Sequence, residues 1–275
     1  MKGFVKLDHY GDYKMVEAAS RTKEAAWKVK HLDDYDRRLE RAAGRVDELS
    51  RDRDLAALVV YEAVLARNGQ PVQEVRELVR RFRETFEDED EPLNIPRVSG
   101  IMNVHGEEWF FGDGKLRQMA GRLLGQFQHR VAQYNYVDER EVLRRWADSY
   151  DTRLFIRRRI PDTEPVAGVV PGVDLQLIQH LRVAAGGNTA IPSRRLAPLL
   201  EALGFAPAAD DYDLIGQVED LALHLELPAP VVAEMLEEMA GEGLTDFPEY
   251  PRPEPEEDEP GTGEEDEAPE DEKHP

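Results

Sequence analysis

The sequence predicts a mainly α-helical protein of several modules, with one small β-hairpin, two C-terminal helix-turn-helix-like hairpins and a disordered acidic tail. Two observations predict the helices and the tail. Apolar residues recur at steps of three and four through most of the 275 residues, which is typical of amphipathic helices. Residues 246–275 instead combine dense acidic charge with proline and few apolar side chains, so they cannot bury enough surface to fold.

The N-terminal region, residues 1–92, is expected to be helical with a short coiled-coil segment. After a predicted helix from Met15 to His31, apolar residues repeat at alternating steps of three and four, which is the pattern of a heptad seam. An intramolecular helical hairpin is favoured over a coiled-coil dimer, because the seam is shorter than the roughly three heptads that identify a coiled coil. As a candidate oligomer seam it comprises Leu32, Tyr35, Leu39, Ala42, Val46 and Leu49.

Two further helices complete this region. Asp52 is expected to cap a helix that stops at Asn68-Gly69, a pair suited to a left-handed helix end. Pro71 opens the next helix, which runs past Phe82. The acidic run that ends at Pro92 marks the boundary of the region.

Residues 93–160 are predicted to form a β-hairpin followed by a basic helical module. Residues 97–104 and 107–111 flank His105-Gly106, which suits a hairpin turn. Asp113 is expected to cap a helix that extends to Val131, and Asp138 a helix that extends to Tyr150.

Residues 161–172 hold three prolines and two glycines and are predicted to be a linker. In the following module, residues 173–247, the segment 192–203 repeats weakly 36 positions later at 228–239, and each copy follows an amphipathic segment. Two helix-turn-helix-like hairpins are the simplest interpretation. Residues 248–275 form the predicted tail.

The second hairpin, residues 220–244, resembles the helix-turn-helix and winged-helix class, with Ala222, Leu227, Val232 and Leu236 at the packing positions. The resemblance implies that the second helix reads the major groove of DNA. That helix instead carries Glu234, Glu237 and Glu238 and no Lys or Arg, so its carboxylates would repel phosphate. A protein-binding or structural hairpin is therefore the preferred interpretation.

Charge is distributed unevenly along a chain of net charge −22. Residues 115–160 hold 11 basic and 5 acidic side chains, whereas residues 161–245 hold 3 and 14. Arginines interleaved with aromatic rings can grip phosphate and stack on bases, although an internal or inter-subunit ionic interface explains the same pattern. The candidate nucleic-acid-binding residues are Arg140, Arg144, Arg145, Trp146, Tyr150, Arg153, Arg157, Arg158, Arg159, Arg194 and Arg195.

No motif supports catalysis, so we expect a protein that is not an enzyme and that has no cofactor and no metal. The absence of cysteine removes thiol nucleophiles and Cys-based zinc sites. The segment 111–115 lacks the residues of a phosphate-binding loop, because Trp109 and Leu116 stand where Gly and Ser or Thr are needed. With no apolar run near 20 residues and no secretion signal at the N-terminus, the expected location is the cytoplasm rather than a membrane.

Two functions fit these observations. The first is a nucleic-acid-associated regulator or adaptor, whose basic helical module contacts the phosphate backbone of DNA or RNA while the acidic tail competes for that surface. The alternative is a structural assembly protein, a viral or scaffold-type adaptor that forms homo-oligomers through its helical hairpins. Protein partners are expected in either case.

Overall fold

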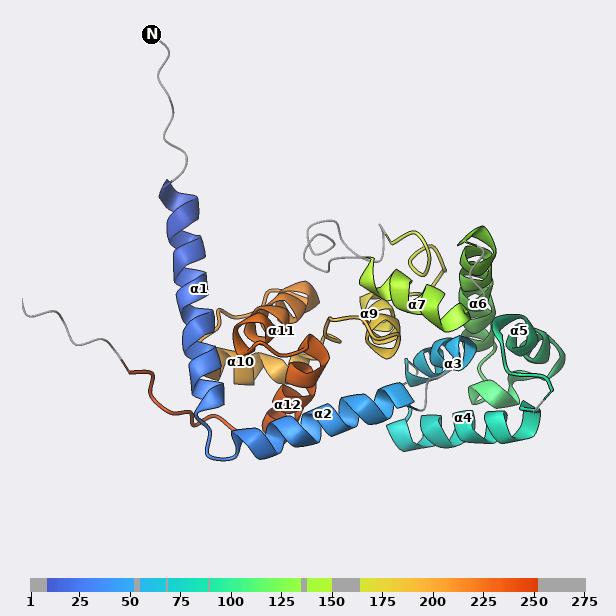
Figure 1. The fold of residues 1–275 in the computed structure, drawn as a ribbon, viewed down its shortest axis with the longest axis horizontal. Coiled ribbons are helices and arrows are strands. Elements are labelled where there is room, and N and C mark those ends of the chain that lie inside the picture. The colour runs from blue at the N-terminus through green and yellow to red at the C-terminus, as the bar shows by residue number, and fades with distance from the viewer. Residues whose placement is uncertain are drawn as a thin grey trace, which may run out of the picture.

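The computed structural model describes residues 9–51, 55–67, 69–88, 90–134, 138–149 and 164–251, and these are mainly helical, as predicted (Figure 1). The α-helices are α1 (His9–Lys30), α2 (Tyr35–Arg51), α3 (Ala56–Ala66), α4 (Val72–Phe86), α5 (Ile95–Val104), α6 (Gly114–Tyr134), α7 (Glu139–Asp148), α9 (Leu175–Ala184), α10 (Ala197–Leu203), α11 (Asp211–Leu225) and α12 (Ala229–Glu242). Two short 3₁₀ helices are η1 (Glu107–Phe110) and η2 (Arg194–Leu196).

The helices bury two hydrophobic cores. The first core is built by α3 to α7, α9 and the segment 166–173, and the second core by α1, α2 and residues 190–244. In Figure 1, α1 stands beside α10 to α12, while α2 runs from this group towards α3 and α4. The second core therefore contains segments from both ends of the chain. These segments belong to the ranges 1–92 and 173–247, which the sequence had suggested as separate modules.

Helix α3 lies at the centre of the first core. Nine of its 11 residues are buried. A helix that is apolar all round needs neighbours on every side. Helices α4, α6 and α9 pack against it, and Tyr61 contacts the rings of Phe82 and Phe110.

The prediction of a β-hairpin is wrong, because residues 95–104 form α5 and residues 107–110 form η1. The side chain of Asn94 accepts a hydrogen bond from the amide of Arg97 at 2.9 Å and caps the helix. Ile95, Val98 and Met102 then lie at helical steps of three and four and are all buried. Within the described residues there is no strand, and the only β-type pairing is an isolated bridge between Asp88 and Glu91.

The cap residues behave as predicted where the structure describes them. Asp113 accepts a hydrogen bond from the amide of Lys115 at 2.7 Å, and Asp138 one from the amide of Arg140 at 2.9 Å. Pro71 is the N-cap of α4. Helix α7 ends at Asp148, two residues before Tyr150, and α3 ends at Ala66. Asp52, Asn68 and residues 252–275 lie outside the described residues.

Residues 164–173 do not form an exposed linker. Val166, Ala167, Val170 and Val173 are buried in the first core. The carboxylate of Glu164, which is 2% exposed, accepts hydrogen bonds from the amides of Val166, Ala167 and Gly168 and from the indole Nε1 of Trp146. The segment is thus folded around one buried carboxylate.

The two predicted C-terminal hairpins differ in the structure. Helices α11 and α12 pack on each other and are joined by a tight turn in which Glu226 has a left-handed φ of 59°. Helix α9, in contrast, packs on α3 and α7 in the first core, whereas α10 packs on α1 and α12 in the second. The sequence repeat therefore does not produce two equivalent hairpins.

Candidate nucleic-acid interface and the cavity between the cores

The basic side chains of α7 lie on an exposed helix face. Arg144 and Arg145 are 52% and 55% exposed, and both pair with Glu141, at 2.9 Å and 2.6 Å. Arg144 also contacts Asp148 at 3.1 Å. The side chain of Arg144 passes beside Gly186, and Arg140 donates a hydrogen bond to the carbonyl of Ala184 at 3.3 Å. Helix α7 thus borders the loop that follows α9.

Trp146 is not a platform for a base, which corrects its assignment from the sequence. Its side chain is only 3% exposed, and its ring contacts Phe127 inside the first core. Its indole Nε1 donates to Glu164 at 3.0 Å. Of the remaining candidates on this segment, Tyr150, Arg153, Arg157, Arg158 and Arg159 lie outside the described residues.

Arg194 and Arg195 begin η2 at the end of the same loop. They are 86% and 69% exposed, and their nearest carboxylates are Asp211 at 3.3 Å and Glu237 at 3.9 Å. The ion pairs of these arginines and of the α7 arginines lie at the protein surface, where water and salt screen them strongly. Phosphate could replace these carboxylates at little cost.

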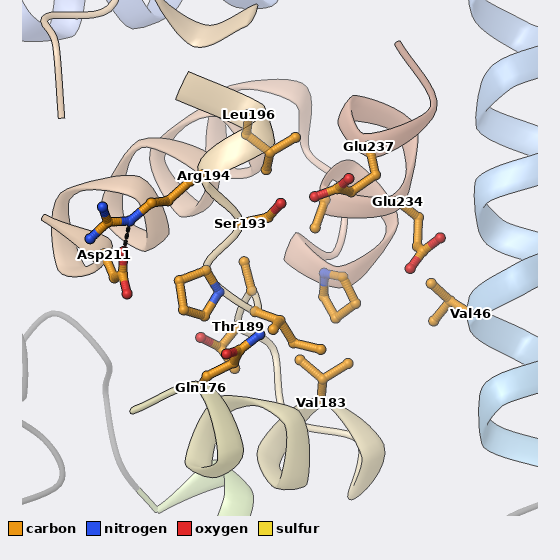
Figure 2. Close-up of a pocket in the computed structure, with 15 residues that line it drawn as sticks. Val46, Gln176, Val183, Thr189, Ser193, Arg194, Leu196, Asp211, Glu234 and Glu237 are labelled. Atoms are coloured by element: carbon orange, nitrogen blue, oxygen red, sulfur yellow. Dashed lines mark hydrogen bonds and ion pairs between the residues drawn. The ribbon is translucent and has the colours of Figure 1, made fainter. Parts of the chain in front are cut away.

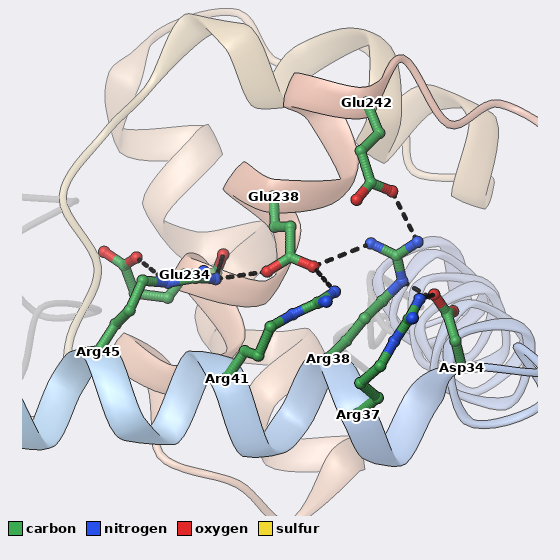
Figure 3. Close-up of polar contacts among 8 residues, drawn as sticks. All are labelled: Asp34, Arg37, Arg38, Arg41, Arg45, Glu234, Glu238 and Glu242. Carbon is green, nitrogen blue, oxygen red and sulfur yellow. Dashed lines mark hydrogen bonds and ion pairs between the residues drawn. The ribbon is translucent and has the colours of Figure 1, made fainter.

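A second and more buried set of ion pairs joins α2 to α12, and we call it the arginine–glutamate ladder (Figure 3). Glu238, which is 13% exposed, pairs with Arg41, with Arg45 at 2.8 Å and with Arg38 at 3.4 Å. The 7% exposed Arg38 also pairs with Asp34 at 2.8 Å and Glu242 at 2.7 Å. The acidic face of α12 is therefore turned towards arginines of its own chain and not towards a DNA groove.

The ladder was missed in the sequence, although a signal existed. Arginines 38, 41 and 45 share one face of α2, and glutamates 234, 238 and 242 share one face of α12. The paired residues are 193 to 204 positions apart along the chain, so nothing local indicates that these faces meet.

The apolar seam of α2 packs within the same chain. Ala42 is fully buried, and Leu32, Tyr35, Leu39 and Val46 are half-buried against the second core, while the side chain of Leu49 lies outside the description. The seam is thus covered by the protein itself rather than left open for a second copy.

A cavity of about 480 Å³ lies between the two cores (Figure 2). Gln176 and Val183 of α9 line one side, Arg194 and Asp211 a second, and Glu234 and Glu237 of α12 a third. The remaining lining residues are Val46, Thr189, Ala190, Ile191, Pro192, Ser193, Leu196, Pro230 and Ala233.

A chain of hydrogen bonds runs through Thr189, which lines the cavity. Arg182 donates to the carbonyl of Ala147 at 3.2 Å and to Gln179 at 3.1 Å. Gln179 donates to the hydroxyl of Thr189 at 2.7 Å, and that hydroxyl donates to Glu219 at 2.7 Å. These bonds connect α7 and α9 of the first core with α11 of the second, so they hold the two walls in register.

The chain matches no known family model, no curated protein and no solved structure. In the part of the chain that the structure describes, no helix has the length and apolar character needed to cross a membrane.

The two arginine partners of Glu141 lower the pKa of its carboxyl group. Hydrogen bonds from Arg144 and Arg145 lower its pKa from the ordinary 4.5 to about 2. Because the folded pKa lies below the unfolded value, these pairs stabilise the fold above about pH 4.5 and stop doing so as the pH falls towards 2. A carbon-detected NMR titration of the Glu141 carboxyl is expected to show this pKa. In Arg144→Gln/Arg145→Gln it should return towards 4.5, and an unchanged pKa would contradict the pairing.

Proposed function

We propose that the protein is a non-enzymatic, nucleic-acid-associated adaptor of the cytoplasm that contacts phosphate through the exposed arginines of α7 and η2. The observation that supports this function is that four guanidinium groups, those of Arg144, Arg145, Arg194 and Arg195, are 52–86% exposed and have ion-pair partners that are themselves at least 29% exposed. Arg38 of the ladder is instead buried among carboxylates. The α7 and η2 arginines can therefore exchange partners.

The acidic tail is the proposed competitor for this surface. Residues 252–275 hold 12 acidic and 2 basic side chains. The chain before them is anchored, because Phe247 packs on the second core and the ring of Tyr250 lies 5.5 Å from that of Trp27. A polyanionic segment tethered to the protein competes with a nucleic acid for cations at high local concentration.

The alternative function, structural assembly, has less support. It needs a surface on which copies associate, and the seam of α2 is occupied by the second core of the same chain. No contact among the described residues favours a second copy over the packing already present.

Removing the tail after Pro251 is expected to strengthen nucleic-acid binding, because the competitor is lost while Phe247 and Tyr250 keep their contacts. Fluorescence anisotropy with labelled duplex DNA and single-stranded RNA would measure affinity at several salt concentrations. Four phosphate contacts on duplex DNA predict a slope of log K against log salt of about −3.6, or an affinity loss of about 100-fold between 50 and 200 mM salt. Absence of binding by the truncated chain at low salt would exclude this function.

A matched pair of variants tests the surface itself. In Arg144→Gln/Arg145→Gln the slope should fall by about 2, since two phosphate contacts are removed. The control, Arg80→Gln/Arg83→Gln, removes two similarly ion-paired arginines from α4. Equal weakening by both pairs would show that only net charge matters and that α7 is not the interface.

A further inference from the structure

The carboxylates that face the cavity between the cores have loose partners. Glu234 lies 3.2 Å from Arg45, Asp211 3.3 Å from Arg194 and Glu237 3.9 Å from Arg195. Glu238, which faces α2, is shared by Arg38, Arg41 and Arg45, and Glu242 pairs with Arg38 at 2.7 Å. Among the described residues, the carboxylate of Glu238 therefore has three arginine partners, whereas the carboxylates of Glu234 and Glu237 have one each.

Apart from these carboxylates and from Arg194, which pairs with Asp211, the cavity lining is apolar or neutral. Val183, Ile191, Pro192 and Pro230 supply hydrocarbon surface, and Ser193 supplies a hydroxyl group. A volume of about 480 Å³ falls within the range of sites for small organic ligands. Hydrocarbon walls with carboxylates at their margin suit a guest with an apolar stem and a positive end.

A metal ion fits this arrangement poorly. Among the residues that the structure describes, no group of three His, Cys, Asp or Glu side chains is placed to hold a metal. The cavity carboxylates come from two different helices, Asp211 from α11 and the glutamates from α12. Charges separated in this way match an extended cation better than a compact one.

We propose that the cavity between the cores binds an aliphatic ammonium or guanidinium cation, with its positive group between Glu234 and Glu237 and its stem against Ile191, Pro192 and Pro230. Such a cation reaches the protein as a free polyamine or as a Lys or Arg side chain of a basic partner. The inference goes beyond the nucleic-acid interface, because it concerns the carboxylates and not the exposed arginines.

The titration of Glu234 is consistent with this site. Burial raises its pKa above the ordinary value, and the nearby charge of Glu237 adds to the rise, although Arg45 and Arg76 oppose it. A positive guest would offset both effects, so binding should lower the pKa of Glu234 and should weaken as the carboxylates become protonated.

NMR titration of the full-length protein with spermidine, and separately with the blocked peptide acetyl-Gly-Arg-Gly-amide, tests the proposal. At constant ionic strength, saturable shifts are expected at the amides of Ser193 and Ala233, and the responding probe identifies the source of the cation. Glu234→Gln/Glu237→Gln should raise the Kd at least tenfold. The control, Glu77→Gln/Glu84→Gln on α4, removes two exposed carboxylates and should leave the Kd unchanged.

Three results would overturn the proposal. Shifts confined to residues 252–275 would show that the amines bind only the acidic tail. Identical shifts with NaCl would show a general ionic effect, and an equal loss of affinity in both variant pairs would show that the cavity is not the site. The wild-type shift map decides between these results even if the cavity variant folds poorly. Failure of the nucleic-acid-binding test would not decide the cation-binding test. The first uses nucleic acid and substitutions of Arg144 and Arg145, and the second uses cations and substitutions of Glu234 and Glu237.

Discussion

Replacing Glu164 with alanine is expected to destabilise the first core by about 3–5 kcal/mol, because several buried hydrogen-bond donors lose their acceptor. The carboxylate is 2% exposed and accepts hydrogen bonds from three consecutive amides and from the indole of Trp146. Without it, these donors remain buried and unpaired, and each such group costs about 1–3 kcal/mol. The segment 166–173 would then lose the group that holds its turn against α7.

Urea unfolding measures this loss, and the indole N–H resonance of Trp146 reports the missing acceptor directly. Glu164→Gln is also expected to destabilise, because its amide group places N–H donors where the carboxylate accepted bonds. Glu77→Ala on the surface of α4 is the control and should leave the stability almost unchanged, because solvent screens its ion pair. If Glu164→Ala were as stable as this control, the buried turn would not have the role assigned to it.

Replacing Glu238 with alanine is expected to cost about 2–3 kcal/mol, because it removes the carboxylate that Arg38, Arg41 and Arg45 share. Arg38 is 7% exposed and cannot turn fully to solvent, although Asp34 and Glu242 still compensate part of its charge. The loss should appear as faster hydrogen exchange in α2 and α12, since the ladder joins these helices.

The effect of Glu238→Ala should depend on pH. Burial raises the pKa of Glu238, but the hydrogen bonds from Arg45 and Arg41 outweigh it, so the net pKa lies below the ordinary 4.5. Because the folded pKa is depressed, the stabilisation is present above pH 4.5 and is lost as the pH falls below it. Wild type and variant should therefore converge in stability in acid. A constant difference down to pH 3 would show that the side chain acts by packing alone.

Local sequence signals predicted the helices well, because caps and periodicity act over a few residues. Asp113 and Asp138 accept the expected amide hydrogen bonds, and Pro71 precedes α4. Residues 95–104 were the main failure, since β-branched and apolar residues near His105-Gly106 also suit a strand. The cap formed by Asn94 and the helical spacing of Ile95, Val98 and Met102 were the signals that outweighed the turn.

The candidate site was only partly predictable. The arginines at 144, 145, 194 and 195 were chosen as candidates from their charge, and the structure shows that they are exposed, whereas Trp146, chosen with them, is buried. The cavity was not predicted at all, because its walls come from α2, from residues 176–211 and from α12.

By itself, the sequence determined the helical class, most helix starts and the uneven distribution of charge, since each depends on neighbours within a few residues. Only the tertiary structure decided which faces meet. It placed α1 and α2 on α10 to α12, covered the seam of α2 and paired Arg38, Arg41 and Arg45 with the glutamates of α12. These outcomes depend on packing between segments far apart along the chain, where periodicity indicates that a face must be buried but not what will bury it.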